Sequence, residues 1–405
     1  MPTPSDSPDD PSISPLELLR ARFALMPDAR AKGRVLHRID EILMIAFCSM
    51  LSDNDAFTDM ETFGKTQEKW LRTFLPLPNG PPSHDVFRNV FIALRPQALL
   101  DILADWCGDL AGRQIKIDGK ALRGTAAANT KQEMVHVLRA WVSEAGISAG
   151  QVVCREKSNE LEALPRLLEL LELKGTLVSI DAMGTHPHIA ERIHEAGGDY
   201  ILALKANQKE AMRAVEARFA ELDAAAGFDV EAIAAGIVPG ALLAPGPLRS
   251  GQSVALSHGR YEQRLCTALD DLDFFHKGWK WAGLQSVVRL IRTTCRGAKR
   301  EELSVETHYY LSSLPADAPR LAKHIREHWA VESFHHVLDV TFGEDHCQVR
   351  DRNAAHNLCI LREMSAQTLR NHLPNRSIRS KRKRAALDPA FRSDLLTSIS
   401  HHFGA

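Results

Sequence analysis

The chain of 405 residues is longer than one hydrophobic core usually covers, so its length predicts two or three folding units. Hydrophobic residues make up 44% and charged residues 25%, an ordinary soluble composition, and no apolar run approaches the roughly 18 residues that a membrane span needs. The net charge of −1 neither favours nor excludes a nucleic-acid partner, because such binding depends on local patches.

The first residues, MPTPSDSPDDPSIS, contain neither a basic start nor an apolar stretch, so they do not match a secretion signal. Their proline, serine and aspartate content predicts a disordered leader over 1–14. The seven cysteines are scattered and form no CxxC pair, which indicates reduced thiols. Together these features predict a cytoplasmic protein.

Residues 15–110 are predicted to form a mostly helical domain. Apolar residues keep a helical period from Leu36 to Phe47, and a second apolar segment runs through Trp70–Phe74. The turn cluster LPLPNGPPSHD then precedes a helix that starts near Ser83.

The pattern changes to strands and helices over 111–222. The stretch QIKID alternates as a strand does and ends in Asp118, and two more strands are expected at 135–143 and 150–157. After an amphipathic helix, GTLVSID is a continuous apolar strand, typical of one buried on both faces, and it ends in Asp181. A helix, a strand and a long helix complete this predicted α/β region.

Residues 223–318 are predicted to be a β-rich insertion. Its first part, 223–252, is rich in Ala, Gly and Pro, as linkers are. Strand-like segments follow at 259–268, 280–294 and 306–313.

A long helix is predicted from about Pro319 to Gly343, and it begins a C-terminal helical region that spans 319–375. The sequence HWAVESFHHVLD places two imidazoles and two carboxylates on one stripe of that helix. These residues are His328, Glu332, His335 and Asp339.

The last segment, 376–405, is predicted to be a basic tail. Its sequence RSIRSKRKR carries six cations and no acid. Such a run is either a solvated surface that keeps the protein soluble or a phosphate contact, because clustered Lys and Arg are the usual electrostatic footprint on DNA or RNA.

Three carboxylates carry the main hypothesis about chemistry. Asp118 and Asp181 each end an apolar strand, and ligands collect at the carboxyl ends of neighbouring parallel strands. With Glu332 they offer three hard oxygen ligands, which suit Mg²⁺ or Mn²⁺, and two such ions about 3.5–4 Å apart can promote phosphodiester chemistry. Taken singly, each aspartate is also explained as an N-cap or turn residue.

Long motifs connect the chain to a known family. The blocks IKIDGKALRGT, GTLVSIDAMGT, GGDYILALKANQ and HWAVESFHHVLDVTFGEDHCQVRDRNAAHNL resemble, in the same order, those of the DDE insertion-sequence transposases of the H-repeat-associated (ISAs-type) group. The resemblance extends from about residue 30 to 390. It implies an α/β fold whose RNase H-like catalytic core is interrupted by the β-rich insertion and preceded by the helical domain, which would recognise DNA ends.

The resemblance also implies a DDE triad of Asp118, Asp181 and Glu332, which would bind two Mg²⁺ ions, with Mn²⁺ able to substitute. The implied reaction is cleavage at the ends of an insertion sequence, followed by transfer of the freed 3′-hydroxyl into target DNA. The implied partners are the terminal repeats of the element, the target DNA and further copies of the chain in a dimer or larger assembly. The implied location is the bacterial cytoplasm, in association with the nucleoid.

The chain departs from the family pattern at three places without losing a carboxylate. It has Ser333–His336 after the glutamate, Ala206 in the LKANQ block, and Thr185-His186 after the second aspartate block. These differences bear on how DNA is positioned.

Basic and amide side chains around the carboxylates and in the insertion are the candidate DNA contacts, because phosphate contacts use such groups. They are Lys120, Arg123, Lys205, Asn207, Gln208, Arg260, Arg264, Arg350 and Arg352. Each is also explained as an ordinary surface residue.

Alternatives remain open at the third acid and for a zinc site. Asp339, Glu344 or Asp345 could replace or assist Glu332, or instead pair with a nearby arginine. Histidines and a cysteine without a recognised zinc spacing also cluster here, namely His335, His336, His346 and Cys347.

Two other functions are compatible with these residues. The first is an RNase H-like DNA nuclease that cuts without strand transfer. The second is a domesticated DNA-binding protein that has no catalytic activity.

Overall fold

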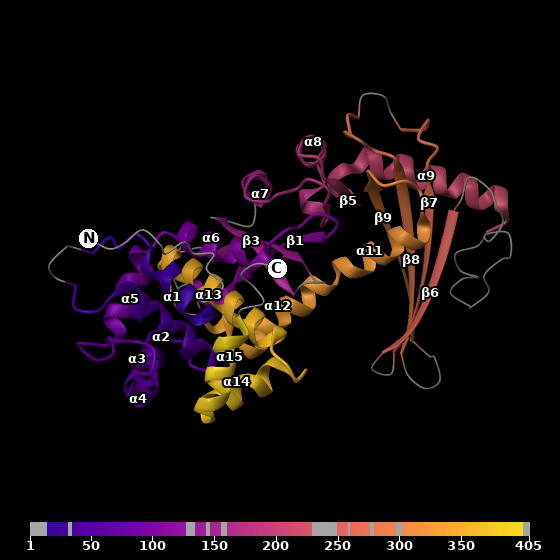
Figure 1. The fold of residues 1–405 in the computed structure, drawn as a ribbon. Coiled ribbons are helices and arrows are strands. Elements are labelled where there is room, and N and C mark those ends of the chain that lie inside the picture. Colours follow the sequence, from indigo (N-terminus) through magenta and orange to yellow (C-terminus); the bar gives the residue numbers. More distant parts are fainter. Residues whose placement is uncertain are drawn as a thin grey trace. The chain divides into compact units, whose positions relative to one another are not determined.

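The computed structural model divides into two units by the contacts within the chain. The first unit comprises residues up to Asp109, Gly119–Asn159 and residues from Glu332 on, and the second comprises Leu110–Asp118 and Glu160–Val331 (Figure 1). The structure describes residues 14–30, 35–126, 134–142, 146–154, 160–228, 249–257, 260–275, 279–296 and 302–399. Over these ranges, no helix is long and apolar enough to cross a membrane.

The first described helix begins at the end of the predicted leader, of which 1–13 lies outside the described residues. Ser14 caps α1 (Pro15–Ala24) through a reciprocal pair of hydrogen bonds. Its Oγ accepts from the backbone N–H of Glu17 at 3.3 Å, and the Glu17 carboxylate accepts from the backbone N–H of Ser14 at 3.0 Å. This pair satisfies two N–H groups that the start of a helix leaves without partners.

The first unit is largely helical, and its N-terminal and C-terminal helices pack together. The N-terminal helices after α1 are α2 (Ile39–Leu51), α3 (Phe57–Thr66), α4 (Glu68–Leu71), α5 (His84–Ala93) and α6 (Pro96–Cys107). The C-terminal helices are α12 (Ala330–Thr341), α13 (Arg352–Asn371), α14 (Ile378–Leu387) and α15 (Pro389–Thr397). The buried Asn357 of α13 joins the two sets, because its Nδ2 donates to the carbonyl oxygens of Phe91 at 2.9 Å and Leu94 at 2.8 Å. The segment predicted as a helical N-terminal domain therefore shares a unit with the end of the chain.

Two antiparallel strands of the first unit lie beside α13. They are β2 (Val135–Val142) and β3 (Ile147–Cys154), where the sequence predicts strands. Val135 and Val137 of β2 pack on Leu122 and on Cys359 of α13. The helix thus covers an apolar face of this hairpin.

The second unit contains a mixed sheet. Its strand order is β1 (Gln114–Leu122), β4 (Leu177–Ile180), β5 (Asp199–Leu204), β9 (Glu302–Ser312), β8 (Ser286–Arg296), β7 (Arg260–Leu269) and β6 (Arg249–Ser257). Only the part of β1 up to Asp118 belongs to this unit. The first three strands are parallel, and each later strand is antiparallel to its neighbour. The predicted β-rich segment supplies the antiparallel part, while 229–248 of its Ala, Gly and Pro stretch lies outside the described residues.

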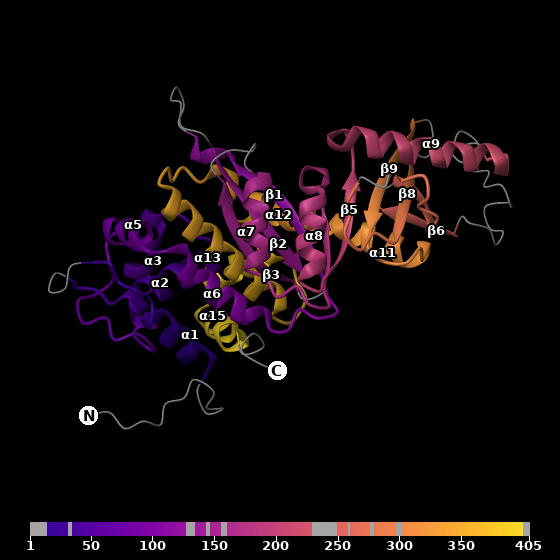
Figure 2. The same ribbon diagram turned by 90° about the horizontal axis from the view of Figure 1, so that it is seen from above.

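Helices cover both faces of this sheet (Figures 1 and 2). Adjacent residues of a strand point to opposite faces, so Tyr309 and Tyr310 of β9 identify the two sides. Tyr309 lies against Phe219 of α9 (Lys209–Ala226), at 5.8 Å between ring centroids. Tyr310 belongs to the core that includes Leu321 and Ile325 of α11 (Ala318–His328). The remaining helices, α7 (Glu160–Glu169) and α8 (Pro187–Glu195), lie side by side.

The long helix predicted from Pro319 to Gly343 is two helices, which corrects the prediction. α11 ends at His328 and α12 begins at Ala330. Trp329 has ψ of −11°, far from the value near −42° of a regular α-helix, so the hydrogen-bond ladder does not continue through it. His328 consequently ends a helix of the second unit, whereas Glu332 lies in the first unit.

The predicted basic tail is also corrected, because residues 378–397 form α14 and α15. Lys381 is buried and donates to the carbonyl oxygens of Leu369 at 2.7 Å and His372 at 2.5 Å, at the end of α13. Arg382 is fully buried and donates to Met50 O and to both carboxylate oxygens of Asp55. The basic run is therefore partly structural, and its exposed cations are Arg376, Arg379, Lys383 and Arg384.

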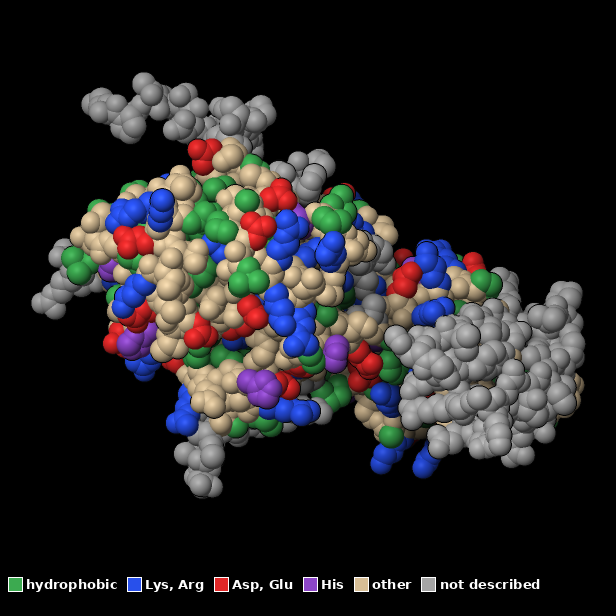
Figure 3. All heavy atoms as spheres, turned by 90° about the horizontal axis from the view of Figure 1, so that it is seen from below, with side chains coloured by type: hydrophobic (Ala, Val, Ile, Leu, Met, Phe, Trp, Pro, Cys, Tyr) green, Lys and Arg blue, Asp and Glu red, His purple; other side chains and the backbone are tan. Residues whose placement is uncertain are grey.

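The surface carries charges of both signs. On the face shown in Figure 3, Lys and Arg side chains form small groups between acidic ones. This mixture agrees with the net charge of −1 over the whole sequence.

Replacing Arg382 is expected to destabilise the fold strongly. Arg382→Ala removes the partner of Asp55 and leaves buried acceptors unsatisfied, so the free energy of unfolding should fall by about 3 kcal/mol. The exposed neighbour Lys383→Ala is the matched control and should change it by less than about 0.5 kcal/mol. Urea denaturation of both variants measures this difference, and similar losses for the two would contradict a structural role for Arg382.

Candidate active site

The parallel pairing of β1 and β4 brings two predicted carboxylates to one sheet edge. Ile117 of β1 is paired with Ile180 of β4. Asp118 and Asp181 are the next residues of the two segments, so they lie next to each other where the pairing of the two strands ends. The prediction that Asp118 ends its strand is wrong, because β1 continues to Leu122. Asp181 does follow the carboxyl end of β4, the position where ligands collect on parallel sheets.

Asp181 has two roles in local structure. It caps the short 3-10 helix η3 (Ala182–Gly184), and its Oδ1 accepts from the backbone N–H of Ala182 at 2.5 Å. The same oxygen accepts from Nζ of Lys205 at 3.1 Å, and both side chains are about half exposed, at 50% and 56%. The capping interpretation therefore holds for Asp181, and its exposed carboxylate is still accessible to a ligand.

Lys205, Asn207 and Gln208 follow β5 and lie at this edge, as predicted. The Nδ2 of Asn207 donates to Ala182 O at 2.6 Å, and the Nε2 of Gln208 donates to Thr185 O at 3.0 Å. These two amides hold the loop that begins at Asp181. Lys205 is the exposed cation of the group, while contacts of all three with DNA stay a prediction.

The chemistry of this edge fits a hard divalent cation. Mg²⁺ is commonly bound by one or two carboxylates together with water and substrate phosphates. Asp118 and Asp181 supply two such carboxylates on neighbouring strands. Among the described residues, no group of three or more His, Cys, Asp or Glu side chains is arranged to hold a metal ion.

Glu332, the predicted third acid, lies in the first turn of α12 and is exposed. The structure thus brings the two aspartates together in the second unit and places Glu332 in the first. Its role in the triad stays a prediction from the family resemblance.

The carboxylates weighed as alternatives to Glu332 belong to an ion-pair cluster within the first unit. Lys120 forms ion pairs with Asp339, with Glu344 at 3.2 Å and with Asp345 at 3.8 Å, and only 10% of its side chain is exposed. This setting differs from the phosphate contact predicted for Lys120. The sequence did not reveal these partners, because they are distant along the chain.

Glu344 is completely buried, and Arg139 donates to its Oε1 at 2.6 Å. Arg139 also pairs with the buried Glu363. Burial would raise the pKa of Glu344, but the positive charges of Arg139 and Lys120 outweigh it and lower that pKa to about 2. Glu344 is thus a structural partner of two cations, which leaves it inaccessible to an external metal ion.

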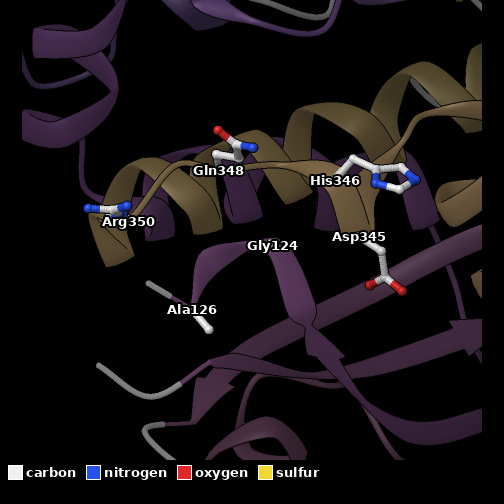
Figure 4. Close-up of a pocket in the computed structure, with 6 residues that line it drawn as sticks. All are labelled: Gly124, Ala126, Asp345, His346, Gln348 and Arg350. Carbon is white, nitrogen blue, oxygen red and sulfur yellow. The ribbon is translucent and has the colours of Figure 1, made fainter. Parts of the chain in front are cut away.

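A cavity of about 460 Å³ opens in the first unit between the segments RGT and EDHCQVR. Figure 4 shows its lining residues, with Asp345, His346, Gln348 and Arg350 on one segment and Gly124 and Ala126 on the other. A Cβ on Gly124 would lie 2.6 Å from Cys347 O and 2.7 Å from Asp345 O. Only glycine allows the two backbones to approach this closely.

The arginines predicted to contact DNA in this region differ in how close they lie to the cavity. Arg350 lines the cavity, and Arg123 has 80% of its side chain exposed, with its Nε 3.8 Å from the Asp345 carboxylate. Arg352 is exposed at the start of α13. Of the two cations predicted on β7, Arg264 pairs with Glu262 at 2.7 Å and is largely covered, and the side chain of Arg260 lies outside the described residues.

His328 was predicted as a member of the polar stripe that faces one site with Glu332. His328 lies with its Nδ1 2.9 Å from Oγ of Ser179, and Ser179 lies two residues before Asp181. The strand period could have revealed this, because alternate residues place Ser179 on the same face of β4 as Asp181.

Comparison with known proteins identifies the family of the chain. The family model described as "Transposase DDE domain" matches residues 109–368, and the DDE_Tnp_1-associated model matches residues 20–107. Together the fold, the paired aspartates and these matches define the class as a DDE transposase.

Individual relatives place the chain more closely. "H repeat-associated putative transposase YhhI" of Escherichia coli (strain K12) is 31% identical over 394 residues, which cover 94% of this chain and 98% of that protein. "Putative transposase YncI" of Escherichia coli O157:H7 is 31% identical over 385 residues, 93% of this chain and 94% of that protein. An uncharacterized protein in the dhlA 3′ region of Xanthobacter autotrophicus is 35% identical over 302 residues, 73% of this chain and 94% of that protein. The chain belongs to the H-repeat-associated group of the DDE transposase family, as its motifs predict.

The buried ion pair of Glu344 predicts a specific pH dependence of stability. Its pKa in the folded protein, about 2, lies below the value of about 4.3 expected when unfolded, so its stabilisation is present above pH ~4.3 and is lost as pH falls toward 2. Between about pH 6 and pH 3, the wild-type chain should lose about 2 kcal/mol more of its free energy of unfolding than Glu344→Gln.

Urea denaturation across this pH range tests the prediction. The exposed Glu191→Gln of α8 is the matched control for the loss of one acid. Parallel pH profiles for wild type and Glu344→Gln would show that Glu344 does not carry the linkage.

Proposed function

We propose that this protein cleaves DNA at the ends of an insertion sequence and joins the freed 3′-hydroxyl to target DNA. The observation that carries the proposal is the pair Asp118 and Asp181, side by side where the parallel pairing of β1 and β4 ends, in a chain of the DDE transposase family. The parallel order β1-β4-β5 at this edge supports an RNase H-like catalytic core.

In this proposal Asp118, Asp181 and Glu332 hold two divalent cations, Mg²⁺ or Mn²⁺. Bound in this way, the cations would activate the attacking oxygen and stabilise charge on the scissile phosphate. The third ligand is assigned by the family resemblance. In this proposal Lys205, which donates to Asp181, contacts the DNA phosphate or orients the carboxylate.

The two steps are both displacements at phosphorus. First, water attacks a phosphodiester at the end of the element, the bond between phosphorus and the 3′ oxygen breaks, and a 3′-hydroxyl is freed. This hydroxyl then attacks a phosphodiester of the target, and the displaced 3′ oxygen of the target leaves with a proton. The number of phosphodiester bonds is unchanged in the second step, so no energy source is needed.

DNA is held, in this proposal, by the exposed cations of each unit. In the first unit these are Arg123, Arg350 and Arg352, and in the second unit Lys205. Both DNA ends must be held together for joining, so we infer a dimer or larger assembly on the DNA. Lys120 is not included, because carboxylates surround it.

Substitution of the aspartates tests the proposed chemistry. Asp118→Asn and Asp181→Asn should each lower cleavage and strand transfer by at least about 100-fold with Mg²⁺, because each removes a charged ligand, while DNA binding persists. The assay uses duplexes taken from both ends of the element that encodes this chain, together with a supercoiled target plasmid. Asp85→Asn, whose side chain is 68% exposed in the first unit, is the control and should keep full activity.

The outcomes separate the proposal from its alternatives. Cleaved ends without joined products would identify a nuclease instead of a transposase. Salt-sensitive DNA binding that is unchanged by Mg²⁺ and by Asp118→Asn, without any cleavage, would identify a DNA-binding protein.

A second test concerns the cavity of the first unit. Arg350→Ala should weaken DNA binding uniformly across sequences and reduce the slope of log K against log salt by about 1, as the loss of one phosphate contact does. Arg192→Ala, which removes a cation paired with Glu169 at 2.8 Å on α8, is the control. Filter binding at several salt concentrations measures both, and an unchanged slope for Arg350→Ala would contradict a phosphate contact.

A further inference from the structure

A chain of hydrogen bonds lies between α11 and the strands that carry the aspartates. Nε2 of Gln114 is 3.0 Å from the carbonyl oxygen of His324 and 2.9 Å from Oγ of Ser179. Oγ of Ser179 is 2.9 Å from Nδ1 of His328, and Oε1 of Gln114 is 3.0 Å from Nδ1 of His324. Every member lies in the second unit.

The direction of each bond follows from one group that can only accept. The carbonyl oxygen of His324 has no hydrogen, so the amide nitrogen of Gln114 must be the atom that faces it. The same nitrogen has a second hydrogen, which it donates to Oγ of Ser179. The orientation of the Gln114 amide is thereby set by the backbone of α11.

Ser179 has a single hydroxyl hydrogen and two possible acceptors for it. Nδ1 of His328 lies at 2.9 Å, while the carbonyl oxygen of Ile115 lies at 3.5 Å, the limit for a hydrogen bond. The shorter contact receives the hydrogen, so Nδ1 of His328 is an acceptor. In a neutral imidazole the other nitrogen, Nε2, then carries the hydrogen.

Acceptance of the Ser179 hydrogen at Nδ1 requires a neutral ring of His328. Burial lowers its pKa below the usual value, and the positive charges of Lys116 and Lys205 act in the same direction. Asp118 and Asp181 act in the opposite direction. His328 lies near Asp181 by its contact with Ser179, which is two residues before Asp181. A neutral ring with a fixed tautomer is a hydrogen-bond donor of one defined direction.

We propose that His328 is a positioning residue of the candidate active site, whose Nε2–H donates to an anionic oxygen at the edge formed by Asp118 and Asp181. The oxygen belongs either to one of these carboxylates or to a DNA phosphate that binds beside them. The inference rests on the proposed function, because it assigns His328 a role at the same edge. Gln114 and Ser179 act through His328 by fixing its tautomer.

Packing alone does not explain these polar residues. The same side of α11 already carries Leu321 and Ile325, which pack in the apolar core of the sheet. Buried polar groups are unfavourable unless every member is paired, and an apolar replacement would hold the helix equally well. The hydrogen bonds from Gln114 through Ser179 instead fix Nε2 of His328 as a donor near Asp118 and Asp181, which indicates a function for that donor.

The tautomer of His328 is measured first, by NMR of the full-length protein labelled with ¹⁵N in histidine, without DNA or metal. The His328 resonances are assigned by their loss in His328→Gln. We expect a neutral ring at pH 7 with hydrogen on Nε2, and a mixture of tautomers in Ser179→Ala. Hydrogen on Nδ1 in the wild-type chain would overturn the proposal, whatever the enzymatic activity.

Two further spectra identify the group that accepts the hydrogen bond from Nε2 of His328. A change of the His328 ring signals in Asp118→Asn or Asp181→Asn without DNA identifies a carboxylate as the acceptor. A change that occurs only when the duplex from the end of the element is added identifies a phosphate. If neither addition of DNA nor these substitutions alters the signals, the proposal fails.

Paired substitutions then test the role in the reaction. The amide nitrogen of His328→Gln reaches the position of Nε2 and keeps a donor, whereas that of His328→Asn occupies the position of Nδ1 and does not. We expect His328→Asn to lower kcat by at least about tenfold with little change in KM for DNA, and His328→Gln to restore most of it. Equal rates in the two variants, with equal denaturation midpoints, would overturn the proposal.

The two hypotheses fail separately. If Asp118→Asn is inactive as expected while His328→Asn keeps wild-type rates, only the role of His328 is refuted. If the wild-type chain neither cleaves nor joins DNA, the proposed function is refuted, and the tautomer measurement still decides the geometry around His328.

Discussion

The parallel register between β1 and β4 is the constraint on which the second unit's chemistry depends. Pairing of Ile117 with Ile180 sets the two following aspartates side by side. Because side chains alternate along a strand, a slip of one residue would move Asp181 to the opposite face from Asp118. The apolar residues Ile115, Ile117, Val178 and Ile180, all buried, hold the register by packing. Burial of these apolar residues therefore fixes the position of the two aspartates relative to each other.

The same alternation explains how a buried strand can carry polar side chains without losing stability. Gln114 and Lys116 of β1 are buried, and they lie on the same face as Asp118. Gln114 forms hydrogen bonds with Ser179 of β4 and His324 of α11, and Ser179 forms one with His328 of α11. A buried polar group that is fully paired is tolerated, and its partners then restrict its orientation. The face of β1 and β4 that includes the aspartates is thus polar, and hydrogen bonds fix the orientation of its side chains. The neighbouring antiparallel strands supply apolar residues that pack against α11.

In the first unit, charged side chains pair with one another in the interior. Arg139, Glu344 and Glu363 are all buried, Arg139 forms ion pairs with both glutamates, and Lys120 of the IDGK motif pairs with Glu344. Removing one partner of such a cluster would leave an uncompensated charge in a low-dielectric interior. Motif residues are for this reason not all catalytic: one short motif supplies a proposed metal ligand, Asp118, and two residues later a structural cation.

Much of the fold and part of the site were predictable from local patterns. The strand that precedes Asp181, the start of the strand through Asp118 and the long α9 follow from periodicity over a few residues, whereas β1 continues past Asp118 to Leu122. The partners of Lys120 and Arg382 lie far along the chain, so no local pattern indicated that these cations are internal. The break at Trp329 was also missed, because helical spacing continues on both sides of it and only the backbone angle differs.

The break at Trp329 also changes the meaning of the polar stripe His328, Glu332, His335 and Asp339. On one continuous helix, these side chains would face a common surface and share one role. In the structure, His328 is bonded to Ser179 in the second unit, and Asp339 is paired with Lys120 in the first. His328 and Asp339 thus each have a partner within their own unit. Since burying a polar group without a partner is unfavourable, the partners found in three dimensions, rather than the spacing along a helix, decide what such residues do.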